Sequence, residues 1–136
     1  MQGGIELKYL SLTNREGLKS TLGGQHDDSD LVSGVYEGGL KVWDCSFDLA
    51  DFVALETASF AGKRVIELGC GQGLPGVMAL KVGASHVVFQ DFNAEVLTNA
   101  TKPVIELNCP DITTSNNYSL VPGSWEQLAS DQSYRG

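Results

Sequence analysis

The sequence has few basic residues, and none of its cysteines form a recognisable pair. Lys and Arg number 9 against 17 Asp and Glu, which gives a formal net charge of -8. A chain this acidic does not resemble a general phosphate-binding surface, so we expect no direct, non-specific nucleic-acid binding. The cysteines are odd in number and form no C-x-x-C motif: Cys45, Cys70 and Cys109. This pattern favours reduced thiols inside the cell and does not support a metal site.

Long hydrophobic runs are also missing. No apolar stretch approaches a membrane span, and the N-terminus lacks the charged-then-apolar order of a signal peptide. We therefore expect a cytoplasmic protein, with the nucleus as a further location, that does not enter a membrane. The 136 residues suffice for one core. Residues 1–30 are expected to be a polar, loosely packed arm and residues 31–136 a partial cofactor-binding domain, whose oligomeric state stays open.

The most informative stretch is Lys63 to Gly76, which reads K-R-V-I-E-L-G-C-G-Q-G-L-P-G. It opens with a run apolar enough to predict a strand buried on both faces: Val65, Ile66 and Leu68. Alternate glycines then allow a sharp turn at positive φ and the close approach of a ligand: Gly69, Gly71 and Gly73. Pro75 suits the first turn of a following helix. The stretch therefore predicts half of a nucleoside-binding site.

A helix is predicted upstream, after a glycine turn at Gly38 and Gly39. Ser46 is its predicted N-cap. Helical spacing predicts that its buried stripe consists of Phe47, Ala50, Val53 and Ala54.

Further elements are predicted downstream. Gly83 should end the glycine-loop helix, and His86 to Gln90 should form a second buried strand that finishes at Asp91. Asn93 should cap the next helix, which Pro103 should kink or end. A weaker third strand and a last capped helix complete the pattern, at Asn117 to Val121 and from Ser124, with Gln127 forming a capping box.

Asp91 lies 22 positions beyond Gly69, at the carboxyl end of the predicted second strand. A carboxylate there can accept hydrogen bonds from both ribose hydroxyls of a nucleoside bound over the glycine turn. NAD is one candidate ligand, because G-x-G-x-x-G is satisfied by Gly71, Gly73 and Gly76. Glu67 and the additional Gly69 favour the pattern E-x-G-x-G-x-G of S-adenosylmethionine-dependent methyltransferases, whose cofactor has no pyrophosphate for an acid to repel.

The chain resembles the seven-β-strand methyltransferases, and among them most of all the protein-histidine N-methyltransferase branch of the methyltransferase-like proteins. The most specific match is S-D-L-V-S-G-V-Y-E-G-G-L-K-V-W-D-C-S-F-D-L at residues 29–49. Three further segments also match: V-I-E-L-G-C-G-Q-G-L-P-G, F-Q-D-F-N and G-S-W. This resemblance implies a Rossmann-like α/β fold, a parallel sheet with helices on both faces. It also implies S-adenosylmethionine as cofactor and methyl transfer to a histidine of a ribosomal large-subunit protein.

The resemblance also implies which residues hold the cofactor. Its border would be formed by Val42, Trp43, Asp44, Cys45 and Ser46. The methionine end would lie at Glu67, Gly69, Gly71 and Gly73, and the ribose and one adenine edge at Gln90, Asp91 and Phe92. The adenine would be flanked by Gly123, Ser124 and Trp125. Without the resemblance, the favoured interpretation of both Trp43 and Trp125 is an ordinary core anchor.

The sequence departs from this family on the substrate side. Chain order places the fourth strand, whose acidic and aromatic residues face the substrate, beyond residue 136. We therefore expect the N-terminal half of the fold only, with one edge of the first strand unpaired and the apolar faces of that strand partly uncovered. No catalytic residue can be named. Two alternatives stay open: a truncated, non-catalytic form that acts through protein contacts, and an NAD-binding oxidoreductase.

Overall fold

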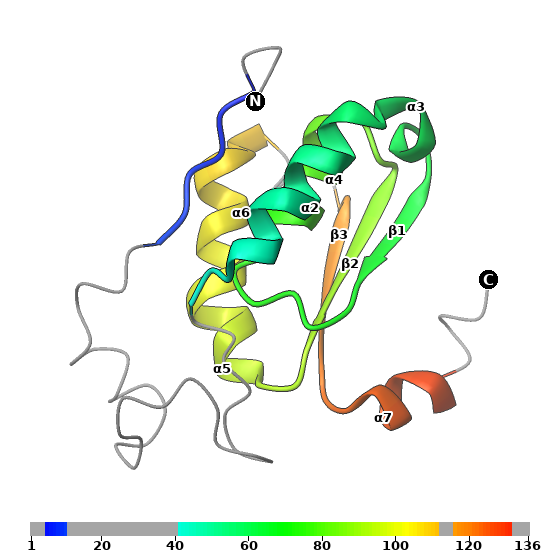
Figure 1. Ribbon diagram of the computed structural model, residues 1–136. Helices are drawn as coiled ribbons and strands as arrows, with labels where there is room; N and C mark the ends of the chain where they lie inside the picture. Colours follow the sequence, from blue (N-terminus) through cyan, green and yellow to red (C-terminus); the bar gives the residue numbers. More distant parts are fainter. Residues whose placement is uncertain (1–4, 11–40, 112–115, 132–136) are drawn as a thin grey trace.

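The computed structural model describes residues 5–10, 41–111 and 116–131 (Figure 1). Its three strands form one parallel sheet in the order β1-β2-β3, and helices join them. This confirms the predicted α/β fold. In chain order the elements are α2 Asp44–Leu55, α3 Thr57–Phe60, β1 Arg64–Glu67, α4 Leu74–Lys81, β2 His86–Asp91, α5 Ala94–Val96, η1 Leu97–Thr101, α6 Lys102–Asn108, β3 Tyr118–Pro122 and α7 Trp125–Ser130.

One face of the sheet forms the core. Phe89, at the centre of this face on β2, is fully buried and lies between Glu67 of β1 and Leu120 of β3. α4 and η1 pack directly on this face, and α2 lies against α4 (Figure 1). The strand residues that belong to the core or pack against it all point to this side: Val65, Val87, Phe89, Tyr118 and Leu120.

The opposite face of β1 is open. Ile66 is 45% exposed and Leu68, just after the strand, is 51% exposed. For the described residues the expectation of burial on both faces is therefore wrong, and the expectation of partly uncovered apolar faces is confirmed. An apolar run places hydrophobic side chains on both faces of a strand, but each face is buried only where another element covers it. Among the described residues β1 pairs with β2 alone, and the helices that pack on the sheet occupy its core face.

Helix α2 begins earlier than predicted. Its N-cap is Trp43, which has an extended backbone and whose carbonyl accepts a hydrogen bond from Ser46 N at 2.9 Å. Ser46 therefore lies in the first turn, and its assignment as N-cap is wrong. Of the predicted stripe, Ala50 and Val53 are buried, as expected. The predicted glycine turn upstream lies outside the described residues.

Residues 5–10 lie against the core rather than apart from it. Ile5, Leu7 and Leu10 pack against the core cluster. The ring of Tyr9 meets Phe47 edge-on, with centroids 5.4 Å apart, and Phe47 is 39% exposed instead of buried. The expectation of a loosely packed arm is therefore wrong for these six residues. The rest of the predicted arm lies outside the described part of the chain.

The helix that contains Pro103 neither stops nor breaks at the proline. Instead, the π-helix η1 joins α5 to α6, and Pro103 lies in the first turn of α6. In an α-helix its ring would clash with the carbonyl of Asn99, four residues earlier, and a wider π-turn relieves that clash. The wider turn also contains Thr101, whose side chain is fully buried beside the glycine loop.

The remaining local predictions agree with the structure. Gly83, at φ +102, follows the end of α4, and the third strand begins one residue later than predicted. Asn93 precedes α5 but makes no side-chain capping bond. Ser124 and Gln127 form the predicted capping box. No helix among the described residues has the length and hydropathy to cross a bilayer.

Gly76 is where α4 comes closest to the sheet. A Cβ at this position would lie 2.3 Å from Phe89 Cε1 and 2.8 Å from Glu67 Oε1. We expect Gly76→Ala to lower the free energy of unfolding by about 1–3 kcal/mol because of overpacking, measured by urea denaturation. In a Phe89→Leu background the same substitution should cost less. Equal costs in the two backgrounds would contradict the proposed clash.

Candidate functional site

The glycine turn joins β1 to α4 with three left-handed glycines. Gly69, Gly71 and Gly73 have φ values of +60°, +54° and +81°. A Cβ at Gly69 would meet no atom within 4 Å, whereas one at Gly73 would lie 3.0 Å from the Phe89 ring. Gly73 therefore allows the loop to pack on the core. Gly69 faces open space and leaves room for a ligand to approach the backbone.

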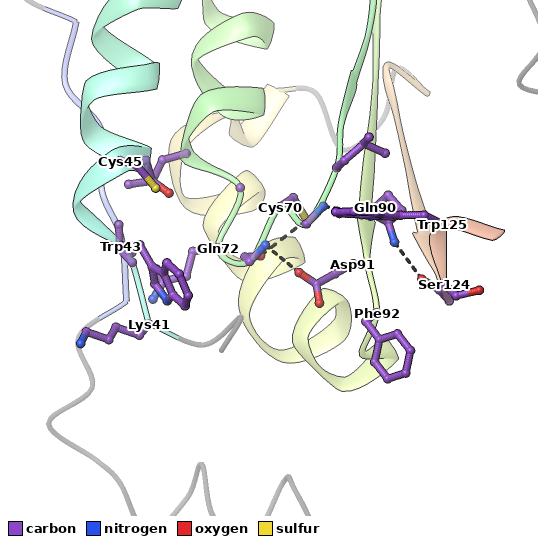
Figure 2. A pocket seen from close by; sticks show the side chains of 18 of the residues that line it. Lys41, Trp43, Cys45, Cys70, Gln72, Gln90, Asp91, Phe92, Ser124 and Trp125 are labelled. Carbon is purple, nitrogen blue, oxygen red and sulfur yellow. Dashed lines mark hydrogen bonds between the residues drawn. The ribbon is translucent and has the colours of Figure 1, made fainter. Parts of the chain in front are cut away.

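The end of β2 holds this turn in place. Asp91 Oδ2 accepts a hydrogen bond from Gly71 N, and Gln90 Oε1 accepts one from Gly69 N, each at 2.9 Å (Figure 2). On the other side of the loop, the Thr101 hydroxyl donates to the carbonyl of Gly71. Asp91 is 4% exposed. Because a carboxylate has about four acceptor positions, Asp91 can hold the turn and still accept from a ligand.

Glu67 lies beneath the turn. Its Oε1 accepts a hydrogen bond from Gly76 N at 2.6 Å. Burial raises the pKa of Glu67 to about 8; the bond from Gly76 opposes this shift, and the nearby Asp91 adds to it. Burial also raises the pKa of the Cys70 thiol, with a further contribution from the charge of Glu67. Cys70 is therefore an inert thiol rather than a nucleophile.

A cavity of about 810 Å³ opens beside the turn. This volume is within the range of small-molecule sites. Aromatic side chains with large exposed surfaces line it: Trp43 is 43% exposed, Trp125 65% and Phe92 39%. Figure 2 shows Trp43 on one side of the glycine turn and Trp125 with Ser124 on the other, with Asp91 between them. The cavity offers ring faces, backbone and a carboxylate, as a nucleoside ligand requires.

The structure brings nearly all of the predicted site residues to this cavity. The exceptions are Asp44, which begins α2, and Glu67, which lies under the turn. Sequence reasoning did not predict some lining residues, although all are close in sequence to predicted ones: Lys41, Leu68, Cys70, Gln72, Leu74 and Glu126. Among the described residues, no group of three or more His, Cys, Asp and Glu side chains could hold a metal ion.

Two side-chain amides attach residues 5–10 to the rest of the fold, one in the glycine turn and one at the end of α6. Gln72, in the glycine turn, accepts from Leu10 N at 2.8 Å and donates to Leu10 O at 3.0 Å. Asn108 of α6 does the same with Lys8 N and O, both at 2.7 Å. Each amide therefore pairs with the extended backbone as a neighbouring strand would. No local pattern could have predicted contacts across 62 and 100 residues.

Comparison with known families agrees with this geometry. A family model described as lysine methyltransferase matches residues 30–135. The chain belongs to this methyltransferase family. The membership favours the methyltransferase interpretation of the glycine turn over an NAD-binding one.

Several similar curated relatives are named as histidine methyltransferases. Histidine protein methyltransferase 1 homologs of Bos taurus and Rattus norvegicus are 43% and 50% identical, covering 77% and 70% of this chain but 30% and 26% of the relatives. Histidine protein methyltransferase 1 of Saccharomyces cerevisiae is 33% identical and covers 94% of the chain and 34% of the relative. The predicted resemblance is thus confirmed, and the chain spans about a third or less of these relatives.

Solved structures support the same fold. PRMT6 aligns with a TM-score of 0.51 at 24% identity over 64% of this chain and 24% of its own. The Trypanosoma brucei PRMT1 enzyme-prozyme complex with AdoHcy aligns with a TM-score of 0.50 at 26% identity, covering 62% of this chain and 25% of the other. These likenesses confirm the predicted Rossmann-like methyltransferase sheet.

The raised pKa of Glu67 predicts a dependence of stability on pH. Between its ordinary value of 4.5 and about 8, the folded state binds this proton more tightly than the unfolded state does. The resulting stabilisation is complete below pH 4.5 and is lost as the pH rises through 8, by up to about 1.4 kcal/mol per pH unit. Glu67→Gln stays neutral throughout.

We therefore expect wild type to lose stability relative to Glu67→Gln between pH 5 and 8, measured by urea denaturation across that range. Because both side chains can accept from Gly76 N, the comparison isolates ionisation. Parallel stability curves for the two proteins would contradict a raised pKa at Glu67.

The amide pairs predict how residues 5–10 respond to substitution. Gln72→Met keeps a similar volume and removes both bonds to Leu10. Each bond contributes about 1 kcal/mol, so the loss of both should accelerate amide exchange at residues 8–10 about thirtyfold, measured by hydrogen–deuterium exchange mass spectrometry. Gln127→Met, which removes the capping-box bond in α7, is the control and should leave this exchange unchanged. Unchanged exchange in Gln72→Met would show that the pair does not hold the segment.

Proposed function

We propose that this chain is the cofactor-binding part of an S-adenosylmethionine-dependent protein-histidine methyltransferase that acts on a ribosomal large-subunit protein. The observation that carries the proposal is the open approach to Gly69, at positive φ on the edge of a cavity with exposed tryptophans. Family membership supplies the reaction class.

The cavity suits each chemical part of this cofactor. Trp125 offers a ring face for the adenine, and Asp91 offers acceptors for ribose hydroxyls. The open backbone at Gly69 gives room for the methionine end. When bound, the cofactor supplies an electrophilic methyl group on its sulfonium. The residues described here would bind and orient it, and no residue is assigned as catalytic.

Histidine is the proposed acceptor because the names of the similar relatives specify it, although the family model is described as lysine methyltransferase. The ribosomal substrate follows from the sequence resemblance, and the proposed location is the cytoplasm, with the nucleus as a further one. With a net charge of -8, the chain is proposed to recognise protein rather than nucleic acid directly.

A non-catalytic role through protein contacts is the second candidate. The exposed apolar surface of Ile66 and Leu68, beside the edge of β1 that is unpaired among the described residues, favours it. Such a form would bind cofactor without transferring its methyl group. The two candidates therefore differ in turnover rather than in affinity for cofactor.

Calorimetric titration with S-adenosylhomocysteine tests the site. We expect saturable binding, and we expect Asp91→Ala to weaken it about tenfold or more, because Gly71 N loses a charged acceptor. Asp48→Ala, on the exposed side of α2, is the matched control and should bind as wild type does. Folded wild-type protein that takes up no S-adenosylhomocysteine would be incompatible with the proposal.

Transfer of a labelled methyl group from S-adenosylmethionine to isolated large ribosomal subunits tests the reaction. Amino-acid analysis after hydrolysis separates methylhistidine from methyllysine. Labelled methylhistidine supports the proposed activity, whereas labelled methyllysine would overturn the choice of histidine. Tight cofactor binding without transfer would favour the non-catalytic alternative.

A further inference from the structure

Gln90 lies where the two sides of the cavity meet. It is on β2, one residue before Asp91, and its side chain points to the sheet face opposite the core cluster. Although this face is open at Ile66, Gln90 itself is only 1% exposed. A buried amide must find partners within the protein, and those of Gln90 come from two separate parts of the chain.

The amide of Gln90 bridges the glycine turn and the end of β3. Its Oε1 accepts from Gly69 N at 2.9 Å and from Trp125 Nε1 at 3.2 Å. Its Nε2 donates to the carbonyl of Gly123 at 2.8 Å (Figure 2). Both acceptor positions of the oxygen are therefore occupied by protein donors, which leaves that oxygen no position for a ligand.

Of the residues that Gln90 contacts, Trp125 is the one whose side-chain orientation depends most on this bridge. Its side chain is 65% exposed and begins α7, which is only six residues long. A large, exposed indole on a short helix can adopt several orientations unless a polar contact fixes it. The bond from Nε1 to Gln90 fixes one edge of the ring and leaves its faces available to the cavity.

We infer that Gln90 is a positioning residue, which sets the glycine turn and the Trp125 indole at the separation and orientation that a nucleoside cofactor requires. In this role the amide oxygen of Gln90 accepts from the protein rather than from the ribose, in contrast to what the sequence resemblance implies. The inference rests on the proposed function for the identity of the ligand, but the bridge itself exists without ligand.

The first test uses ligand-free protein. Gln90→Met keeps the length of the side chain and removes the amide, so the Trp125 indole N–H resonance should move in a ¹H–¹⁵N spectrum and its exchange with water should accelerate. Trp125→Phe identifies that resonance, and the indole of Trp43 is the internal control. An unmoved Trp125 resonance in Gln90→Met would overturn the inference.

The second test is a double-mutant cycle on the affinity for S-adenosylhomocysteine, measured by calorimetry. We expect Gln90→Met alone to weaken binding about tenfold. In a Trp125→Phe background, which lacks the indole N–H, the loss of affinity caused by Gln90→Met should be at least threefold smaller than in wild type. Additive effects of the two substitutions would overturn the inference, because a residue that only fills the core would act independently of the indole.

If Gln90→Met does not fold, Gln90→Glu can be used in its place. Its carboxylate can accept from both Gly69 N and Trp125 Nε1 but cannot donate to Gly123. The Trp125 indole should then stay hydrogen-bonded, and its loss would count against the bridge. The two proposals can fail separately. If the Trp125 resonance moves in Gln90→Met but wild-type protein does not bind S-adenosylhomocysteine, the bridge is supported and only the proposed ligand is overturned.

Discussion

The cavity depends on the hydrogen bonds that the last two residues of β2 make to the glycine turn. Successive side chains of a strand point to opposite faces, so Asp91 reaches Gly71 from the core side and Gln90 reaches Gly69 from the other. Two peptide groups of one turn are thereby held from both faces of the sheet. A turn without such partners would expose unpaired N–H groups and leave the floor of the cavity without a fixed shape.

The sequence predicted this centre well because its signals are local. A strand, alternate glycines and a following helix identified the turn, and Asp91 was found from its spacing to Gly69. Sequence reasoning missed features that depend on distant partners, such as the buried Thr101 hydroxyl at the loop and the amide of Gln72 on Leu10. For the first strand it gave two expectations, burial on both faces from the apolar run and partly uncovered faces from the unpaired edge, and the exposure of Ile66 agrees with the second.

The motif's glycines are alike in sequence but not in role. Gly73 and Gly76 are required because aromatic atoms of Phe89 lie against them, so they belong to the packing of α4 on the sheet. Gly69 has open space where a side chain would be, so its identity relates to conformation and to a ligand. Glu67, the acid of the same motif, supports Gly76 from below rather than lining the cavity. One short motif thus combines a packing requirement with a binding requirement.

The amide pairs of residues 5–10 affect the order in which the chain can fold during synthesis. Lys8 and Leu10 leave the ribosome before their partners Asn108 and Gln72, which follow 100 and 62 residues later. At about 5–20 residues per second, the N-terminal segment waits on the order of 5–20 s before Asn108 is made. Residues 5–10 therefore cannot complete both amide pairs until the chain has been made as far as Asn108.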